Sequence, residues 1–166
     1  MINKLIVGSE EWCSITSLNI PSIKVRIDSG AKTSALHAIN IVPFQKSNEN
    51  WVKFDVNPLQ KNNNISIHCE AKVIDKRIIK SSSGARELRY VIQTEIEFGG
   101  MTWDIELTLT NRDSMGYRML LGREAMAGRL IVDPEQNFLQ GEPNKEKLKE
   151  DIYKFIISVY KGTVIR

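Results

Sequence analysis

The stretch that decides the fold reads IKVRIDSGAKTSALHA and spans residues 23–38. Its apolar residues alternate with polar ones up to Ile27, which predicts a β-strand with one buried face. The strand ends at once in Asp28, and the small residues that follow are typical of a tight turn. Gly30 would let the backbone approach another molecule closely, either a second copy of the chain or a substrate.

Alternation of the same kind runs through the middle of the chain. Four segments place apolar residues at every second position: 51–56, 65–73, 90–98 and 101–110. Because Gly99 and Gly100 separate the last two segments, we predict a hairpin with a two-residue turn there. The repeated pattern predicts a mostly antiparallel β domain whose sheet is closed or strongly curved.

Two stretches interrupt the alternation, at residues 57–64 and 80–88. The first is polar and predicts an ordinary surface connection. The second, KSSSGAREL, is rich in small and basic residues. It predicts either a mobile hairpin tip over a site or a plain surface turn.

The end of the chain follows a different period. Asn144 is a candidate N-cap, and the apolar residues after it recur at intervals of three and four, as in an amphipathic helix. These residues are Leu148, Ile152, Phe155, Ile156 and Val159. We therefore predict two units, a β domain at residues 1–141 and a helical tail at residues 142–166.

Composition excludes several classes of protein. The 23 basic and 20 acidic residues give a net charge of +3, which is too small to indicate nucleic-acid binding. The first residues lack the features of a signal peptide and no apolar run reaches membrane-spanning length, so we expect a cytoplasmic protein that does not contact membranes. Cys13 and Cys69 form no metal or redox motif, and we expect buried thiols.

A later segment, YRMLLGREAM at residues 117–126, completes the pattern that the Asp-Ser-Gly-Ala turn begins. Such a turn, together with an apolar strand running into Gly122, resembles the retropepsin-like aspartic peptidases. The strings IDSGAKTSALHA, CEAKVIDKRIIKSSSGARELRYVI, IELTLTNRDSMGYRMLLGREAM and GRLIVDP narrow the resemblance. They are similar to bacterial and archaeal proteins called ATP-dependent zinc proteases, often found with the glutamate ligases that modify ribosomal protein S6. The resemblance covers roughly residues 5–141.

The resemblance implies an all-β fold, a closed acid-protease (retropepsin-like) barrel with short helices, followed here by the C-terminal amphipathic helix. It also implies an aspartic endopeptidase, in which two carboxylates share a proton and activate a water molecule. Because the chain has one Asp-Ser-Gly triplet, Asp28 of a twofold-related chain would supply the second carboxylate in a homodimer. The residues expected to support the turn are Ser29, Gly30, Ala31, Leu120, Leu121 and Gly122.

Three alternatives remain. The triplet at Asp28 could be only a strand-end turn, or the chain could be a non-catalytic regulatory or binding domain that partners an S6-type glutamate ligase. A zinc peptidase would use His37, His68 and a carboxylate, although no H-E-x-x-H or paired C-x-x-C motif occurs. His68 and Cys69 are neighbours on a predicted strand, so their side chains should point to opposite faces. No G-x-x-x-x-G-K-[ST] loop is present, and we expect no cofactor.

Basic residues cluster in sequence around the two segments expected to edge the site, Lys80 among them. They suggest an acidic peptide or protein substrate, although charges on strand faces are more commonly just solvated. The candidate substrate-binding residues are Thr33, Ser34, Ser83, Gly84, Arg86, Arg89, Arg118 and Arg123.

Overall fold

The computed structural model describes residues 3–60, 62–81, 83–112 and 116–164, with side chains described as far as residue 154. The predicted helix positions Phe155, Ile156 and Val159 therefore lie outside the described side chains. The elements, in chain order, are β1 (Leu5–Val7), β2 (Glu10–Ile15), η1 (Thr16–Leu18), β3 (Ile20–Ile27), β4 (Ser34–His37), β5 (Ile39–Lys46), β6 (Glu49–Val56), β7 (Ile67–Lys80), β8 (Arg86–Phe98), β9 (Met101–Thr110), β10 (Met119–Leu121), α1 (Arg123–Met126), β11 (Leu130–Val132) and α2 (Lys145–Val164).

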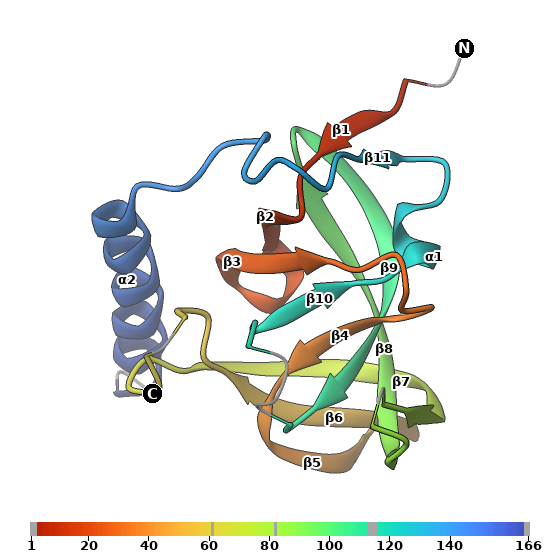
Figure 1. Cartoon of the computed structure of the whole chain (residues 1–166). Coiled ribbons are helices and arrows are strands. Elements are labelled where there is room, and N and C mark those ends of the chain that lie inside the picture. Colours follow the sequence, from red (N-terminus) through yellow and green to blue (C-terminus); the bar gives the residue numbers. More distant parts are fainter. Residues whose placement is uncertain (1–2, 61, 82, 113–115, 165–166) are drawn as a thin grey trace.

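The predicted all-β fold is confirmed, and most of the strands form one curved sheet (Figure 1). Its order is β2-β3-β10-β4-β9-β8-β7-β6-β5, and β2 pairs with β8 as well. Six strands thus form a ring, from which β7, β6 and β5 continue outward. The ring closes through a single residue pair, Ser14 with Glu97, so the predicted barrel is closed only at that point.

The alternating apolar residues of the ring strands meet in its interior. Ile23, Val25, Ile92, Leu107 and Met119 are all 0% exposed, although they come from four different strands. Burial of this kind is the main stabilising contribution in a domain of this size. The pattern read from the sequence therefore identifies the core of the ring.

The predicted hairpin between β8 and β9 is confirmed. Phe98 pairs with Met101, so Gly99 and Gly100 form a two-residue turn. Their φ angles of 54° and 81° lie in the left-handed region that such turns require and that glycine adopts without strain.

The β7 and β8 strands extend well beyond the ring as a two-stranded arm (Figure 1). We call residues 75–80 and 86–91 the β7–β8 arm. β6 pairs with β7 only up to Lys72, and β9 pairs with β8 only up to Val91, so no further strand of the described chain flanks the arm. The loop predicted over residues 80–88 is shorter than expected, because Lys80 and residues 86–88 continue the ladder.

Asn144 is the N-cap of helix α2, as predicted, and its side-chain oxygen accepts the backbone N–H groups of Glu146 and Lys147 at 3.0 and 3.2 Å. Its residues Leu148 and Ile152 are buried against Leu59 and Ile65. The connection over residues 57–64 is therefore not a plain surface loop, since Leu59 lies under the helix. No helix in the described part of the chain is long and apolar enough to cross a membrane.

Candidate active site

The Asp28 turn is built at the end of β3 and is fixed by β10. β10 lies between β3 and β4, parallel to the first and antiparallel to the second. The backbone N–H of Asp28 donates to the carbonyl of Leu121 at 2.9 Å, which extends this pairing into the turn. Asp28 Oδ1 accepts the N–H of Gly30 at 2.9 Å, so the carboxylate is held by its own turn. The side chain is half-buried.

Gly122 lies directly behind this turn. A Cβ at Gly122 would come 2.7 Å from Thr33 C and 2.9 Å from Ala31 O, so only glycine fits. Its N–H donates to the hydroxyl of Ser34 at 3.0 Å, and the N–H of Arg123 donates to the carbonyl of Ala31 at 2.8 Å. The apolar strand and its glycine thus brace the Asp28 loop.

The other supporting residues occupy both sides of the turn. Leu121 is fully buried beside Ile27, and Leu120 is half-buried beside Ala35. Ser29 and Gly30 are exposed at the apex. The turn therefore combines a buried base with an open apex, which is suited to presenting a carboxylate to another molecule.

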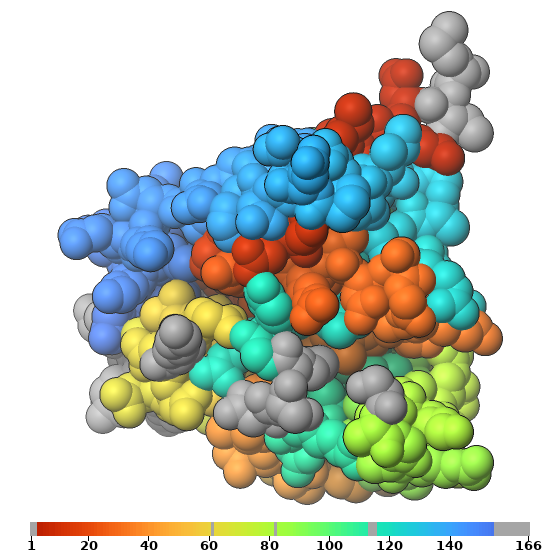
Figure 2. Space-filling model, in the orientation of Figure 1, coloured from red at the N-terminus to blue at the C-terminus, as the bar shows by residue number. Residues whose placement is uncertain are grey.

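A cleft of about 780 Å³ separates the Asp28 loop from the β7–β8 arm. Residues 30–33 form one side of it and residues 77–80 form the other. Glu106 and Thr108 of β9 and Glu124 of α1 complete the lining. In Figure 2 the orange Asp28 loop lies above the yellow-green tip of the arm, on the same side of the molecule.

The candidate substrate-binding residues are split among three places. Thr33 lines the cleft, and Arg123 donates to the carbonyl of Gly30 at 3.2 Å, so both lie at the Asp28 turn. Ser83, Gly84 and Arg86 are exposed at the tip of the arm.

The remaining three candidates are buried. Ser34 is only 1% exposed and holds Gly122. Arg89 is 9% exposed and donates to Glu87 at 3.0 Å. Arg118 is 5% exposed and donates to the side chain of Asn63 at 2.6 Å. These side chains form contacts within the fold, so sequence clustering of basic residues did not identify one surface.

Sequence reasoning missed a group of charges that lines the cleft. Arg77 Nε lies 2.7 Å from Asp75 Oδ2, and Arg77 Nη1 lies 2.5 Å from Glu106 Oε2. Hydrogen bonds from the Arg77 guanidinium lower the pKa values of both carboxyls below their usual range, and the two carboxylates, Glu106 first, raise the pKa of Arg77. Arg77 and Glu106 are 29 residues apart, and no local motif links them.

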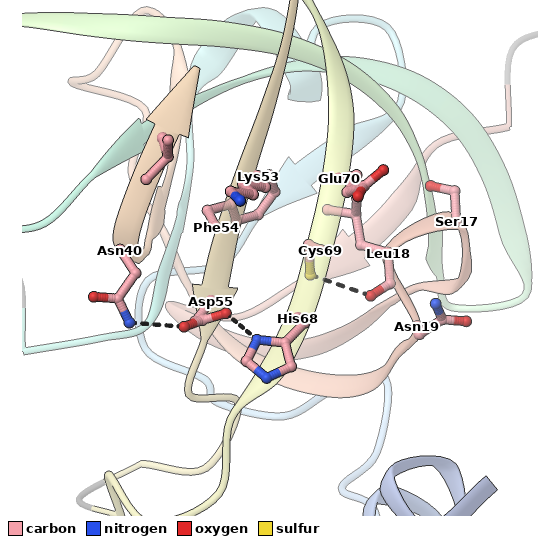
Figure 3. A pocket seen from close by; sticks show the side chains of 11 residues that line it. Ser17, Leu18, Asn19, Asn40, Lys53, Phe54, Asp55, His68, Cys69 and Glu70 are labelled. Atoms are coloured by element: carbon pink, nitrogen blue, oxygen red, sulfur yellow. Dashed lines mark hydrogen bonds and ion pairs between the residues drawn. The ribbon is translucent and has the colours of Figure 1, made fainter. Parts of the chain in front are cut away.

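The two histidines of the zinc alternative lie in different surroundings. His37 is 5% exposed on β4, whereas the His68 side chain on β7 is 81% exposed and contacts Asp55. Figure 3 shows Asp55 between His68 and Asn40, in a pocket that does not include His37. Within the part of the chain that the structure describes, no three His, Cys, Asp or Glu side chains are grouped so as to hold a metal ion.

Cys13 and Cys69 are free and buried, as predicted. Cys69 faces inward while His68 faces outward, which agrees with their expected opposite orientation. Burial raises the pKa of each thiol to about 12. Neither cysteine is therefore suited to act as a nucleophile.

Comparison with known proteins places this site in context. A model of the RimB-like family, described as "Retropepsin-like aspartic endopeptidase RimB", matches residues 6–143. A protein of Shewanella halifaxensis named "Probable alpha-L-glutamate ligase" is 55% identical over 148 residues, which are 89% of this chain and 32% of that protein. One of the same name from Desulfotalea psychrophila is 57% identical over 147 residues, 89% of this chain and 32% of that protein. The chain spans about a third of the length of these curated relatives.

Among solved structures, the chain is similar to Lpg0085, a Legionella pneumophila protein of unknown function. The two share 26% identity with a TM-score of 0.69, over 83% of this chain and 99% of that one.

Proposed function

The chain belongs to the RimB-like family of retropepsin-like aspartic endopeptidases, and on that premise we propose that it hydrolyses peptide bonds as a homodimer with one catalytic Asp28 from each chain. The observation that carries the proposal is the presentation of Asp28. The backbone of its turn is fixed by β10 and Gly122, yet its carboxylate is half-buried at an open apex.

The chemistry follows from bringing two such turns together. Two neighbouring carboxylates cannot both ionise easily, so they hold one proton between them. The ionised member takes a proton from a water molecule, which attacks the peptide carbonyl, while the protonated member donates to the carbonyl oxygen. When the tetrahedral intermediate collapses, the C–N bond breaks, the leaving nitrogen takes the proton that the first carboxyl received, and the second carboxyl regains its own from the intermediate's hydroxyl. The hydrogen bond from Gly30 N–H to Asp28 Oδ1 restrains the orientation of the carboxylate that each chain would bring to the dimer. The symmetric arrangement supplies the second carboxylate that a single chain lacks.

We propose an acidic peptide or protein as the substrate. The curated relatives are named for ligation of glutamate, and basic side chains lie beside the cleft. Lys32 and Lys80 line it, and Arg123 contacts the turn itself. Thr33 lines the cleft, and Ser83, Gly84 and Arg86 are exposed at the tip of the arm; in this proposal they would contact an extended peptide.

The decisive test replaces Asp28 and compares it with a matched turn. Asp28→Asn keeps the size of the side chain but removes the base and the shared proton, so peptide cleavage should fall by about 10²–10⁴-fold while light scattering still detects a dimer. Asp133→Asn is the control, because Asp133 accepts the N–H of Glu135 at 3.1 Å in a turn of the same type after β11. Retained cleavage in Asp28→Asn protein, or a monomer at every working concentration of wild type, would refute the proposal.

A second candidate function follows from the names of the relatives. Because the chain matches about a third of proteins named as ligases, it could serve such a ligase as a non-catalytic binding domain. A dimer whose two Asp28 carboxylates are too far apart to share a proton would favour this function.

The zinc alternative predicts stoichiometric metal in purified protein, and activity lost on chelation or on replacing His37 or His68. The aspartic mechanism predicts activity that survives chelation.

A further inference from the structure

The position of the β7–β8 arm depends on side-chain contacts rather than on strand pairing. Past Lys72 and Val91 the ladders to β6 and β9 end, and no other described strand borders the arm. A two-stranded ribbon without a neighbouring strand is only marginally stable in water. Something other than backbone pairing must therefore hold the arm beside the cleft.

Arg77 supplies the contact on the side of the cleft. It projects from the arm and bridges two carboxylates, Asp75 on its own strand at 2.7 Å and Glu106 on β9 at 2.5 Å. The planar guanidinium can bind both at once through different nitrogens, which a lysine cannot do. The contact with Glu106 ties the arm to the ring.

The same group of charges continues into the loop that carries Asp28. Glu106 feels the positive charge of Lys32, which contributes to lowering the pKa of Glu106 after the larger effect of Arg77. Lys32 Nζ lies 3.7 Å from Glu124 Oε1 of α1. The backbone N–H of Glu124 also donates to the backbone carbonyl of Lys32 at 3.2 Å. The charges from Arg77 to Glu124 therefore line the cleft from the arm to the Asp28 loop.

A second contact holds the arm farther toward its tip. Glu87 accepts the hydroxyl of Thr110 at 3.0 Å, Arg89 Nε at 3.0 Å and Arg112 Nε at 3.4 Å. Because this cluster remains when Arg77 is altered, loss of Arg77 should loosen the arm without detaching it.

We propose that Arg77 is a positioning residue, which through Glu106 holds the β7–β8 arm against the cleft beside Asp28 and so sets how tightly a peptide is bound. The proposal rests on the proposed peptidase function. It assigns Arg77 to substrate binding and leaves the proton transfers to Asp28.

The size of the effect is limited by solvent. The side chains of Arg77 and Glu106 are 33% and 40% exposed, so water and salt screen their attraction. Loss of an ion pair of this kind changes the equilibrium between the held and the released arm by roughly two- to fivefold. Because Arg77 also contacts Asp75, we expect a change at the upper end of that range. We therefore expect a several-fold change in arm opening, together with sensitivity to salt.

Hydrogen exchange tests the positioning role without any activity. Arg77→Met and the control Lys76→Met are made in the Asp28→Asn background. Lys76 is the preceding residue on β7, with its Nζ over the ring of Tyr90 at 5.4 Å and no place in the lining of the cleft. Amides of the arm should exchange about three- to fivefold faster in Arg77→Met and change less than twofold in Lys76→Met. Glu106→Gln should reproduce the Arg77 result.

Salt and kinetics complete the test. High salt should speed arm exchange more in the parent protein than in Arg77→Met, because, of the ion pairs described for the arm, the variant keeps only those of Glu87 for salt to screen. In the active background, Arg77→Met should raise KM several-fold with kcat within twofold. Equal exchange in Arg77→Met and Lys76→Met would overturn the proposal, as would faster exchange with an unchanged KM. If the wild-type protein cleaves no peptide, the proposed peptidase function is wrong. The exchange comparison then decides by itself whether Arg77 positions the arm.

Discussion

A methyl group at position 122 tests how tightly the Asp28 turn is held. In Gly122→Ala the new Cβ would lie 2.7 Å from Thr33 C, 2.9 Å from Ala31 O and 3.0 Å from Lys32 O. Ordinary contacts of a Cβ begin near 3.4 Å, so the shortfall is 0.4 to 0.7 Å (3.4 less 3.0 and 3.4 less 2.7). All three atoms belong to backbone, so no side-chain rotation relieves the overlap. The Asp28 loop itself must move.

Both stability and activity should respond to that movement. Overpacking of this kind costs about 1–3 kcal/mol of unfolding free energy. A 1 Å displacement of a catalytic group lowers the rate by about 10²-fold, so a shift of about half that size should lower peptide cleavage roughly tenfold. The φ of −89° at Gly122 suits any residue, so the effect is steric rather than conformational. Denaturant unfolding and peptide cleavage measure the two effects separately.

Gly100→Ala is the matched control. Its φ of +81° makes alanine unfavourable by about 1–2 kcal/mol, but no atom lies within 4 Å of the new Cβ and the site is in the β8–β9 turn. It should lower stability without lowering activity once the fraction folded is taken into account. If Gly122→Ala unfolds within 0.5 kcal/mol of wild type and cleaves peptides at the same rate, β10 does not lock the turn and our account of its support is wrong.

Three further measurements probe other parts of the molecule. Glu11 is fully buried, and its carboxylate accepts three backbone N–H groups. In Glu11→Gln the new amide NH₂ would face these donors, so the unfolding free energy should fall by about 2–3 kcal/mol. An unchanged unfolding curve would contradict this. Cys13 and Cys69, whose pKa values burial raises to about 12, should resist alkylation at pH 8 until the protein unfolds, so rapid labelling of native protein would count against the fold. The pKa values of Asp75 and Glu106 lie below their ordinary values of 3.8 and 4.5. The two carboxylates therefore help to hold the arm above their ordinary pKa values, and this contribution is lost as the pH falls through their lowered pKa values in the folded protein. Exchange in the arm, corrected for the intrinsic pH dependence, should increase below about pH 4, and an increase between pH 8 and 5 would exclude this cause.

Much of the fold was predictable because its signals are local. The period-two alternation that runs up to Ile27 identified one wall of the core, and Gly99 and Gly100 identified the β8–β9 turn. The Asp-Ser-Gly-Ala turn and the apolar strand before Gly122 predicted the family, which the match over residues 6–143 confirms. In the first two cases the burial or the backbone conformation of a residue is determined by its near neighbours in sequence, and in the third each of the two motifs is a short continuous string.

The rest depends on contacts between distant residues. Arg89 and Arg118 are charged, and the sequence favours exposure, yet they are 9% and 5% exposed. Their partners include Thr108 and Asn63, and no motif marks either pair. The contact between Arg77 and Glu106 likewise crosses from one strand to another. Side chains of this kind are placed by how the strands pair, and sequence periodicity does not specify that pairing in advance.

The two sides of the cleft are held by different kinds of force, and this difference separates their roles. The Asp28 loop rests on backbone hydrogen bonds and on close packing against Gly122, which salt and moderate pH alter little, and its ion pair between Lys32 and Glu124 is largely exposed. The arm is held through Arg77 and Glu106 by partly exposed charges that salt can screen. Substitutions under the loop should therefore change kcat and stability together, whereas substitutions among the charges should change KM and exchange in the arm. In the proposed dimer, the rigid side would fix the distance between the two Asp28 carboxylates, and the adjustable side would accommodate peptides of different sequence.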